Sequence, residues 1–172
     1  MQVSTFFQTG GTASDLMTRA LPHGADLVVE LGVGTGAITQ TLLSKVSHPE
    51  GYLGIELNPD MIEFAQERFP LLRFVNDSAE NFPKYLNGRK VTGVVSSLPW
   101  SLMPQATVTA ILDAIYDNLT DDGVFSTYLT VHVLKTPAGR RVQAQLQDKF
   151  SSLESKLVLD NLPPVKVFIA KK

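Results

Sequence analysis

A carboxylate and three alternating glycines stand close together near the start of the chain. In the stretch LVVELGVGTGAITQT (27–41), Glu30 precedes Gly32, Gly34 and Gly36. Glycines let the backbone turn sharply and leave no side chain between the chain and a ligand. The helix expected to follow would point its first N–H groups at that ligand. The spacing therefore predicts a nucleotide-type cofactor site at the end of a first strand.

Two cofactors compete for this site. The spacing Gly-x-Gly-x-x-Ala satisfies the dinucleotide fingerprint, and Glu56 follows about 20 residues later, as a ribose-binding acid should. S-adenosylmethionine (SAM) is favoured because Glu30 can face the cationic amino group of a methionine moiety. No Lys or Arg between the first glycine and Lys45 is available for a pyrophosphate. The alternative role for Glu30 is structural, as an acceptor for nearby N–H groups.

The ends of the next three strands complete the predicted cofactor site. Glu56 is expected to accept hydrogen bonds from two ribose hydroxyls, because both carboxylate oxygens can accept at once. Asp77 could accept from an adenine amino group, or cap a helix, or do both. Met61 could pack against adenine or belong to the core. The predicted contacts at these strand ends are Glu56, Leu57, Asp77, Ser78, Ala79, Ser97 and Leu98.

Three further side chains are candidates for the chemistry on a methyl acceptor. Trp100 follows Pro99 at a strand end and could offer its ring face to a cationic or planar acceptor. Tyr128 could bind a partly methylated ammonium group together with Trp100. His132 could contact the acceptor or remove a proton. For Tyr128 and His132, a purely structural role is the alternative.

These residues need a regular alternation of strands and helices to position them. Five β-α units followed by two terminal strands predict an α/β fold: a Rossmann-like, doubly wound sheet of seven strands, mostly parallel with an antiparallel last strand, and helices on both faces. We expect one domain over 1–172. Strands are expected at 26–31, 51–56, 71–76, 91–96, 123–130, 152–159 and 165–170, and helices at 36–46, 59–69, 79–87, 105–119 and 137–150.

Composition excludes several classes of protein. The net charge of −2 does not favour nucleic-acid binding, and the absence of cysteine excludes thiolate chemistry and disulfides. Three scattered histidines do not predict a metal site. No apolar run is long enough to span a bilayer and no signal peptide is evident, so the expected location is the cytoplasm, with peripheral membrane contact left open.

The motif E-x-G-x-G-x-G with a later acidic strand end resembles class I SAM-dependent methyltransferases. Within them, the SSLPW stretch (96–100) is similar to the Asn-Leu-Pro-Tyr of ribosomal RNA adenine dimethylases, with Ser97 and Trp100 in place of Asn and Tyr. GIELNPDM (54–61), SSLPWSLMP (96–104) and NLPPVKVFIAKK (161–172) are more similar to bacterial phospholipid N-methyltransferases.

The second resemblance implies an acceptor and a membrane contact. It implies methyl transfer to the amine of phosphatidylethanolamine, in a pocket beside the Leu-Pro turn and under an N-terminal helical segment over 1–22. In that family the helix docks on anionic membrane. Here residues 12–21 predict a short helix with Arg19 as its only cation, and Phe6 with Phe7 could insert at an interface.

The sequence thus predicts a SAM-dependent N-methyltransferase acting on a phospholipid head group or another small amine. Three alternatives stay open: an adenine N6-methyltransferase acting on RNA, a SAM-binding partner subunit without activity of its own, and a dinucleotide-linked oxidoreductase.

Overall fold

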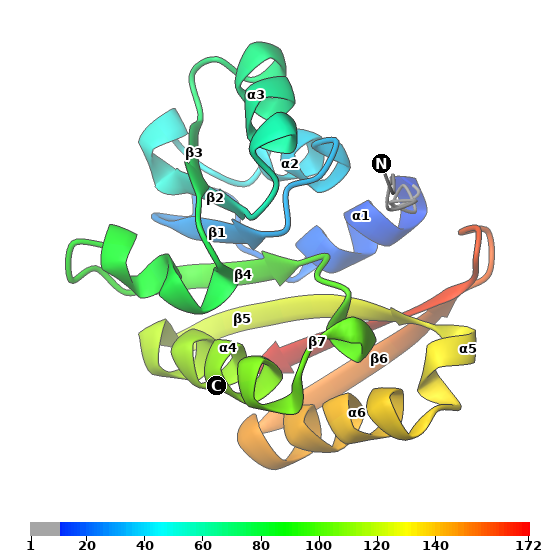
Figure 1. The fold of residues 1–172 in the computed structure, drawn as a ribbon. Coiled ribbons are helices and arrows are strands. Elements are labelled where there is room, and N and C mark those ends of the chain that lie inside the picture. Colours follow the sequence, from blue (N-terminus) through cyan, green and yellow to red (C-terminus); the bar gives the residue numbers. More distant parts are fainter. Residues whose placement is uncertain (1–10) are drawn as a thin grey trace.

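The computed structural model describes residues 11–172, so the predicted insertion of Phe6 and Phe7 lies outside the described residues. Seven strands form one sheet in the order β3-β2-β1-β4-β5-β7-β6 (Figure 1). Strands β1 to β5 run parallel to one another, and β7 runs antiparallel to both β5 and β6. The predicted fold is confirmed. The strands are β1 (Val28–Leu31), β2 (Tyr52–Glu56), β3 (Arg73–Asn76), β4 (Val91–Ser96), β5 (Leu119–Thr130), β6 (Ser152–Val158) and β7 (Val165–Lys171).

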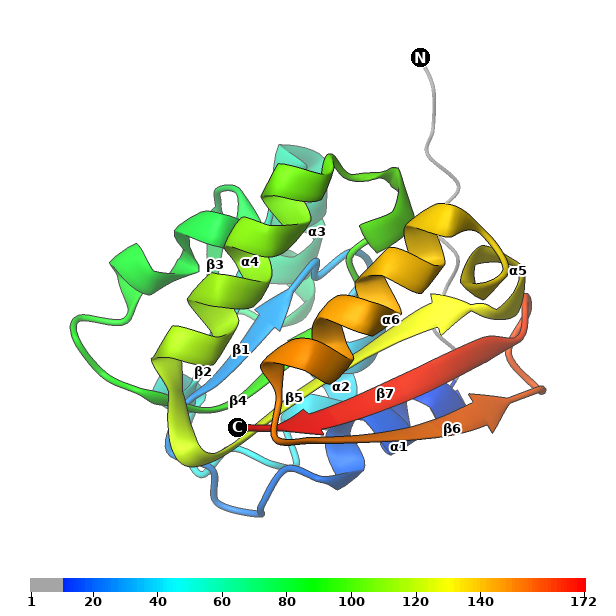
Figure 2. The same cartoon turned by 90° about the horizontal axis from the view of Figure 1, so that it is seen from below.

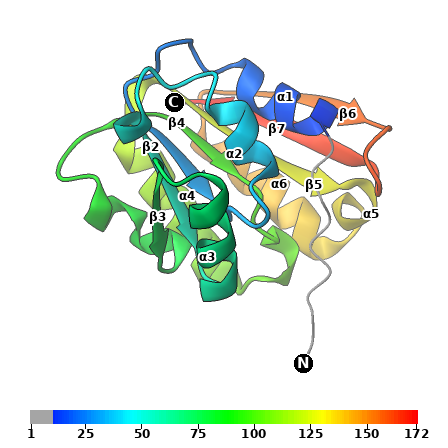
Figure 3. The same cartoon turned by 90° about the horizontal axis from the view of Figure 1, so that it is seen from above.

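Helices cover both faces of the sheet. Figure 2 shows α4 (Gln105–Asn118) and α6 (Pro137–Lys149) on one face. Figure 3 shows α1 (Gly11–Arg19), α2 (Ala37–Leu42) and α3 (Pro59–Arg68) on the other. Each face has its own cluster of buried side chains, with Val29 and Leu31 of β1 in one and Val28 in the other. Strand β1 is therefore buried on both faces, as a central parallel strand should be.

Short elements complete the chain. They are the 3-10 helices η1 (Pro49–Gly51), η2 (Ala79–Tyr85) and η3 (Trp100–Leu102), and the one-turn helix α5 (Val131–Leu134). The sequence predicted η2 as a short helix over 79–87. Pro83 lies inside η2, and because proline has no N–H it does not continue an α-helical ladder.

Two predicted boundaries differ most from those in the structure. The helix expected over 36–46 ends at Leu42, because the N–H of Lys45 turns back to the carbonyl of Leu42 in a tighter turn. Strand β5 begins at Leu119 rather than at 123. Its pairing with β4 shifts register between Val91 and Gly93, so the early part of β5 joins the sheet through an irregularity that alternation does not reveal.

A helix forms at Gly11–Arg19, close to the short helix that residues 12–21 predict. Helix α1 packs on α2, β5 and β7, and it buries Ala13 and Met17 completely. The hydroxyl of Ser126 on β5 donates to the carbonyl of Met17 at 2.6 Å. No helix within residues 11–172 has both the length and the apolarity to cross a bilayer.

Candidate active site

The glycine loop between β1 and α2 adopts a backbone that only glycine accepts readily. The φ angles of Gly32, Gly34 and Gly36 are +83°, +52° and +78°. The end of α3 holds this loop from outside. The guanidinium of Arg68 donates to the carbonyl of Thr35 at 2.8 Å, and the ring of Phe69 packs directly against Gly36.

Glu56 ends β2 and ties the glycine loop to the next turn. One carboxylate oxygen accepts the N–H of Gly34 at 3.0 Å, and the other accepts the N–H of Asn58 at 2.9 Å. A carboxylate oxygen can accept two hydrogen bonds, so each keeps a lone pair for a further donor such as a ribose hydroxyl. The predicted role of Glu56 therefore agrees with the geometry and stays a prediction.

Replacing Glu56 by Ala is expected to weaken SAM binding by about 1–3 kcal/mol, through the loss of charge-assisted hydrogen bonds. Glu56→Gln keeps one accepting oxygen and should fall between Ala and the wild type. Isothermal titration of SAM into the three proteins measures the difference. Unchanged affinity in Glu56→Ala would exclude a contact between Glu56 and the cofactor.

Glu30 lies near the end of β1, as predicted, and its carboxylate is held by side chains of β2 and α2. Its side chain is fully buried and lines none of the cavity described below. One carboxylate oxygen accepts the hydroxyls of Tyr52 on β2 at 2.6 Å and of Thr39 on α2 at 2.7 Å. Burial raises the pKa of Glu30 from 4.5 to about 7. This geometry fits the structural alternative, in which Glu30 joins β1, β2 and α2 beneath the glycine loop, and its contact with the amino group of the cofactor stays a prediction.

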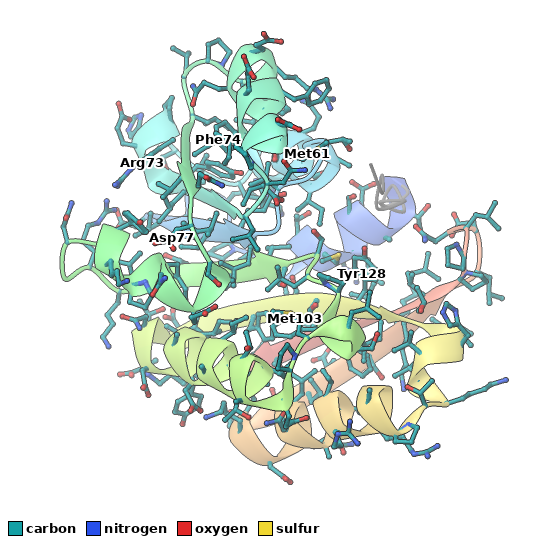
Figure 4. All side chains as sticks on the ribbon, in the orientation of Figure 1. Met61, Arg73, Phe74, Asp77, Met103 and Tyr128 are labelled. Carbon is teal, nitrogen blue, oxygen red and sulfur yellow. The ribbon has the colours of Figure 1, made fainter. Side chains whose placement is uncertain are left out.

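Asp77 follows β3 and is engaged by its own segment. Its carboxylate accepts from Tyr85 at 2.6 Å, from Asn81 at 2.8 Å and from the N–H of Ser78 at 2.7 Å. These hydrogen bonds, with that from Tyr85 the largest, hold the pKa of Asp77 below its usual range. Ala79 is buried, and Leu57 is exposed. In Figure 4, Asp77 and Met61 lie toward the β2–β3 side of the molecule, and Tyr128 lies over β5.

A cavity of about 380 Å³ opens at the carboxyl ends of β1, β4 and β5, beside the glycine loop. In a doubly wound sheet this edge, where the strand order reverses between β1 and β4, is where ligands bind. Four segments of the chain form its walls. Its lining residues are Val33, Gly34, Thr35, Ala37 and Ile38; Ser97 to Leu102; Tyr128, Leu129, Thr130, His132 and Val133; and Asn161, Pro163 and Val165.

The Leu-Pro turn forms one wall of this cavity and is anchored at both ends. The hydroxyl of Ser97 donates to the carbonyl of Gly32 at 2.5 Å, which joins the turn to the glycine loop. The indole N–H of Trp100 donates to the hydroxyl of Thr127 at 2.7 Å, and that hydroxyl donates to the carbonyl of Ser96 at 3.0 Å.

This anchoring corrects the role expected for Trp100. Its side chain is only 2% exposed and packs edge-on against Phe125 in the core. The ring face is therefore covered by protein and is not offered to an acceptor. Trp100 touches the cavity but acts as an anchor that fixes the Leu-Pro turn against β5.

Tyr128 and His132 do reach the cavity. Tyr128 is half-buried near the end of β5, and His132 is exposed on α5. The hydroxyl of Thr130 lies 3.5 Å from Nε2 of His132. The structure brings these two residues to the same cavity as Ser97 and Leu98, so they remain candidates for acceptor contact and proton removal.

Residues 28–123, more than half of the chain, match the methyltransferase domain family. The chain belongs to that family. Curated relatives include the ribosomal RNA small subunit methyltransferase A of Burkholderia ambifaria, which is 36% identical over 69 residues. The match spans 39% of this methyltransferase and 25% of the length of that relative.

Solved structures of methyltransferases share the fold across almost the whole chain. N-methyltransferase NodS from Bradyrhizobium japonicum has a TM-score of 0.76 at 12% identity, covering 100% of this chain and 99% of its own. A SAM-dependent methyltransferase from Archaeoglobus fulgidus has a TM-score of 0.74 at 15% identity, covering 96% of each chain. The predictions of a methyltransferase and of SAM as its cofactor are confirmed.

This methyltransferase positions its site with residues that the sequence analysis did not single out. Thr39 and Tyr52 hold Glu30, and Thr127 holds Trp100. Asn161 and Pro163, from the β6–β7 loop, add a fourth wall to the cavity. The sequence carried no signal for Tyr52, because its position depends on the register of the sheet: Glu30 pairs with Gly54, so side chains at 52 and 30 share one face.

Proposed function

We propose that this methyltransferase transfers methyl groups to the amine of a phosphatidylethanolamine-type phospholipid. One observation carries the proposal: within the described residues, the cavity beside the glycine loop is lined by no Asp, Glu, Lys or Arg side chain. Two exposed leucines flank it, Leu102 at 83% and Leu162 at 87%. A neutral, apolar cavity with a leucine rim suits a small amine carried on an apolar tail.

The cavity also suits the deprotonation step that N-methylation needs. An ethanolamine nitrogen is protonated near neutral pH and must lose a proton before its lone pair can attack. Transfer into an apolar cavity disfavours the charged form and lowers the pKa of the ammonium. His132, exposed at the cavity, can accept the released proton and pass it to water.

The cofactor supplies the group that is transferred. SAM, when bound, presents a methyl group on a positively charged sulfur. The glycine loop would hold it, together with Glu56 at the ribose. The walls formed by the Leu-Pro turn and β5 keep the acceptor amine in line and exclude water, and such positioning provides much of the rate enhancement.

A second candidate function is adenine methylation of RNA, which the identity to a ribosomal RNA methyltransferase favours. RNA binding draws most of its affinity from contacts between cations and phosphates. The absence of Lys and Arg from the described cavity lining and the net charge of −2 favour the phospholipid instead.

Methyl-labelled SAM distinguishes these functions when it is incubated with phosphatidylethanolamine vesicles in one tube and ribosomal RNA in another. We expect label in the lipid phase only. Gly34→Asp is the control. The introduced aspartate side chain would enter the cavity, and the φ angle of +52° at this position disfavours any residue with a Cβ, so this variant should transfer no methyl group. Label in the RNA alone would overturn the phospholipid proposal in favour of the second candidate.

A further inference from the structure

A second hollow of about 730 Å³ lies beside the active site, between α1 and the end of β6. We name it the basic groove. Its lining contains four basic side chains and two acidic ones. The basic residues are Arg19, His23, Lys45 and Lys156, the acidic ones are Asp15 and Asp160, and the rest are Thr12, Leu16, Thr18, Thr41, Ser44, Leu157, Val158 and Leu159.

Some of these charged side chains form hydrogen bonds within the described part of the chain, and others form none there. Asp160 accepts the hydroxyl of Thr12 at 2.6 Å, and Lys45, nearly buried, donates to the carbonyl of Leu21 at 3.4 Å. Arg19 and Lys156 are exposed, and within residues 11–172 neither forms an ion pair or a side-chain hydrogen bond. Two unpaired cations in a hollow fit an anionic group such as a phosphate.

The segment that separates the basic groove from the active-site cavity is unusually apolar. We name residues 157–162 the leucine loop. Its first residues line the groove, and Asn161 at its far end lines the cavity. Leu159 is 71% exposed, Leu162 more so, and Leu157 is also exposed. In Figures 1 and 3 this loop, coloured orange to red, projects at the edge of the molecule beyond α5.

Exposed leucines beside unpaired cations are typical of a surface that meets lipid. The apolar side chains enter the acyl boundary while the cations contact anionic head groups. A folded RNA would use the cations but would leave the leucines in water. We propose that the basic groove binds the phosphate of an anionic phospholipid while the leucine loop dips into the same bilayer, which turns the active-site cavity toward the membrane.

This inference rests on the proposed function, since it gives a lipid acceptor a route to the cavity. Binding is therefore tested on vesicles that contain no phosphatidylethanolamine, so that docking and methyl transfer are scored separately. The full chain is sedimented with vesicles of phosphatidylcholine alone and with vesicles that contain an equal amount of phosphatidylglycerol. We expect binding to the anionic vesicles only, weakening as salt is added.

Two variants and two matched controls locate the contact. Arg19→Ala with Lys156→Ala should weaken vesicle binding about twenty-five-fold, since each cation near an anionic surface contributes about fivefold. Lys90→Ala with Lys171→Ala removes the same charge from the end of the sheet where β4 begins and β7 ends, and this variant should bind as the wild type does. Leu159→Asp should weaken binding about tenfold. Leu71→Asp, at an equally exposed leucine of the α3–β3 turn, should not.

Each variant must keep the rise in melting temperature that SAM causes, which shows that it is folded. Methylation of phosphatidylethanolamine by a protein whose groove variants bind anionic vesicles normally would overturn the inference and leave the proposed function standing. Groove-dependent vesicle binding without lipid methylation would overturn the proposed function alone. A rise in melting temperature with inorganic phosphate but no binding to vesicles would also overturn the inference. So would groove variants that lose binding to ribosomal RNA and keep binding to anionic vesicles.

Discussion

Replacing Gly36 by Ala is expected to destabilise the protein by about 2–5 kcal/mol and to abolish measurable SAM binding. The φ angle of +78° alone costs a residue with a Cβ about 1–2 kcal/mol. A Cβ at this position would also lie 2.6 Å from Cε2 of Phe69, closer than any van der Waals contact allows. Phe69 is buried and cannot swing away, so the glycine loop itself must shift.

Two companion variants separate the two causes. Gly34→Ala has a φ of +52° but no atom within 4 Å of its Cβ, so it should show the backbone cost alone, about 1–2 kcal/mol. Phe69→Ala in the Gly36→Ala background removes the collision. In urea unfolding, the double variant should then lose less free energy of unfolding than the sum of the losses in the two single variants. Full additivity would show that Phe69 does not press on the loop.

The sequence predicted those parts of the site that depend on neighbouring residues. The strand that ends in a carboxylate and the glycines that follow act locally, so their types and spacing predict both the turn and its position. The alternation of strands and helices likewise predicted the doubly wound sheet, because connections between such elements follow few paths.

The sequence could not predict the surroundings of side chains whose direction is decided by distant partners. Nothing near Glu30 in the sequence shows that Tyr52 and Thr39 will meet its carboxylate. Trp100 looks free to stack until Thr127, from another strand, accepts its indole N–H. A motif therefore identifies the edge of the sheet where chemistry takes place, whereas the packing of several elements decides which side chains face the ligand.

Replacing Glu30 by Gln should remove a pH dependence of stability that the wild type carries. The folded protein holds the proton of Glu30 more tightly than the unfolded chain does, because burial raises its pKa from 4.5 to about 7. Below pH 4.5 both states are protonated and Glu30 contributes no slope. As pH rises from there to about 7, the unfolded state releases the proton first, so the free energy of unfolding falls, by about 3 kcal/mol in all.

Urea unfolding at a series of pH values measures that fall in the wild type and in Glu30→Gln. The amide is neutral throughout, so the variant should lack this part of the slope. It should also carry a constant cost of about 1–3 kcal/mol from its unpaired N–H groups, because the second oxygen of Glu30 has no partner within residues 11–172. Glu63→Gln, at an exposed position of α3, should keep the wild-type profile. Parallel profiles for the wild type and Glu30→Gln would mean that Glu30 is already ionised in the fold. The network of Tyr52 and Thr39 would then hold a charge beneath the glycine loop rather than a neutral acid.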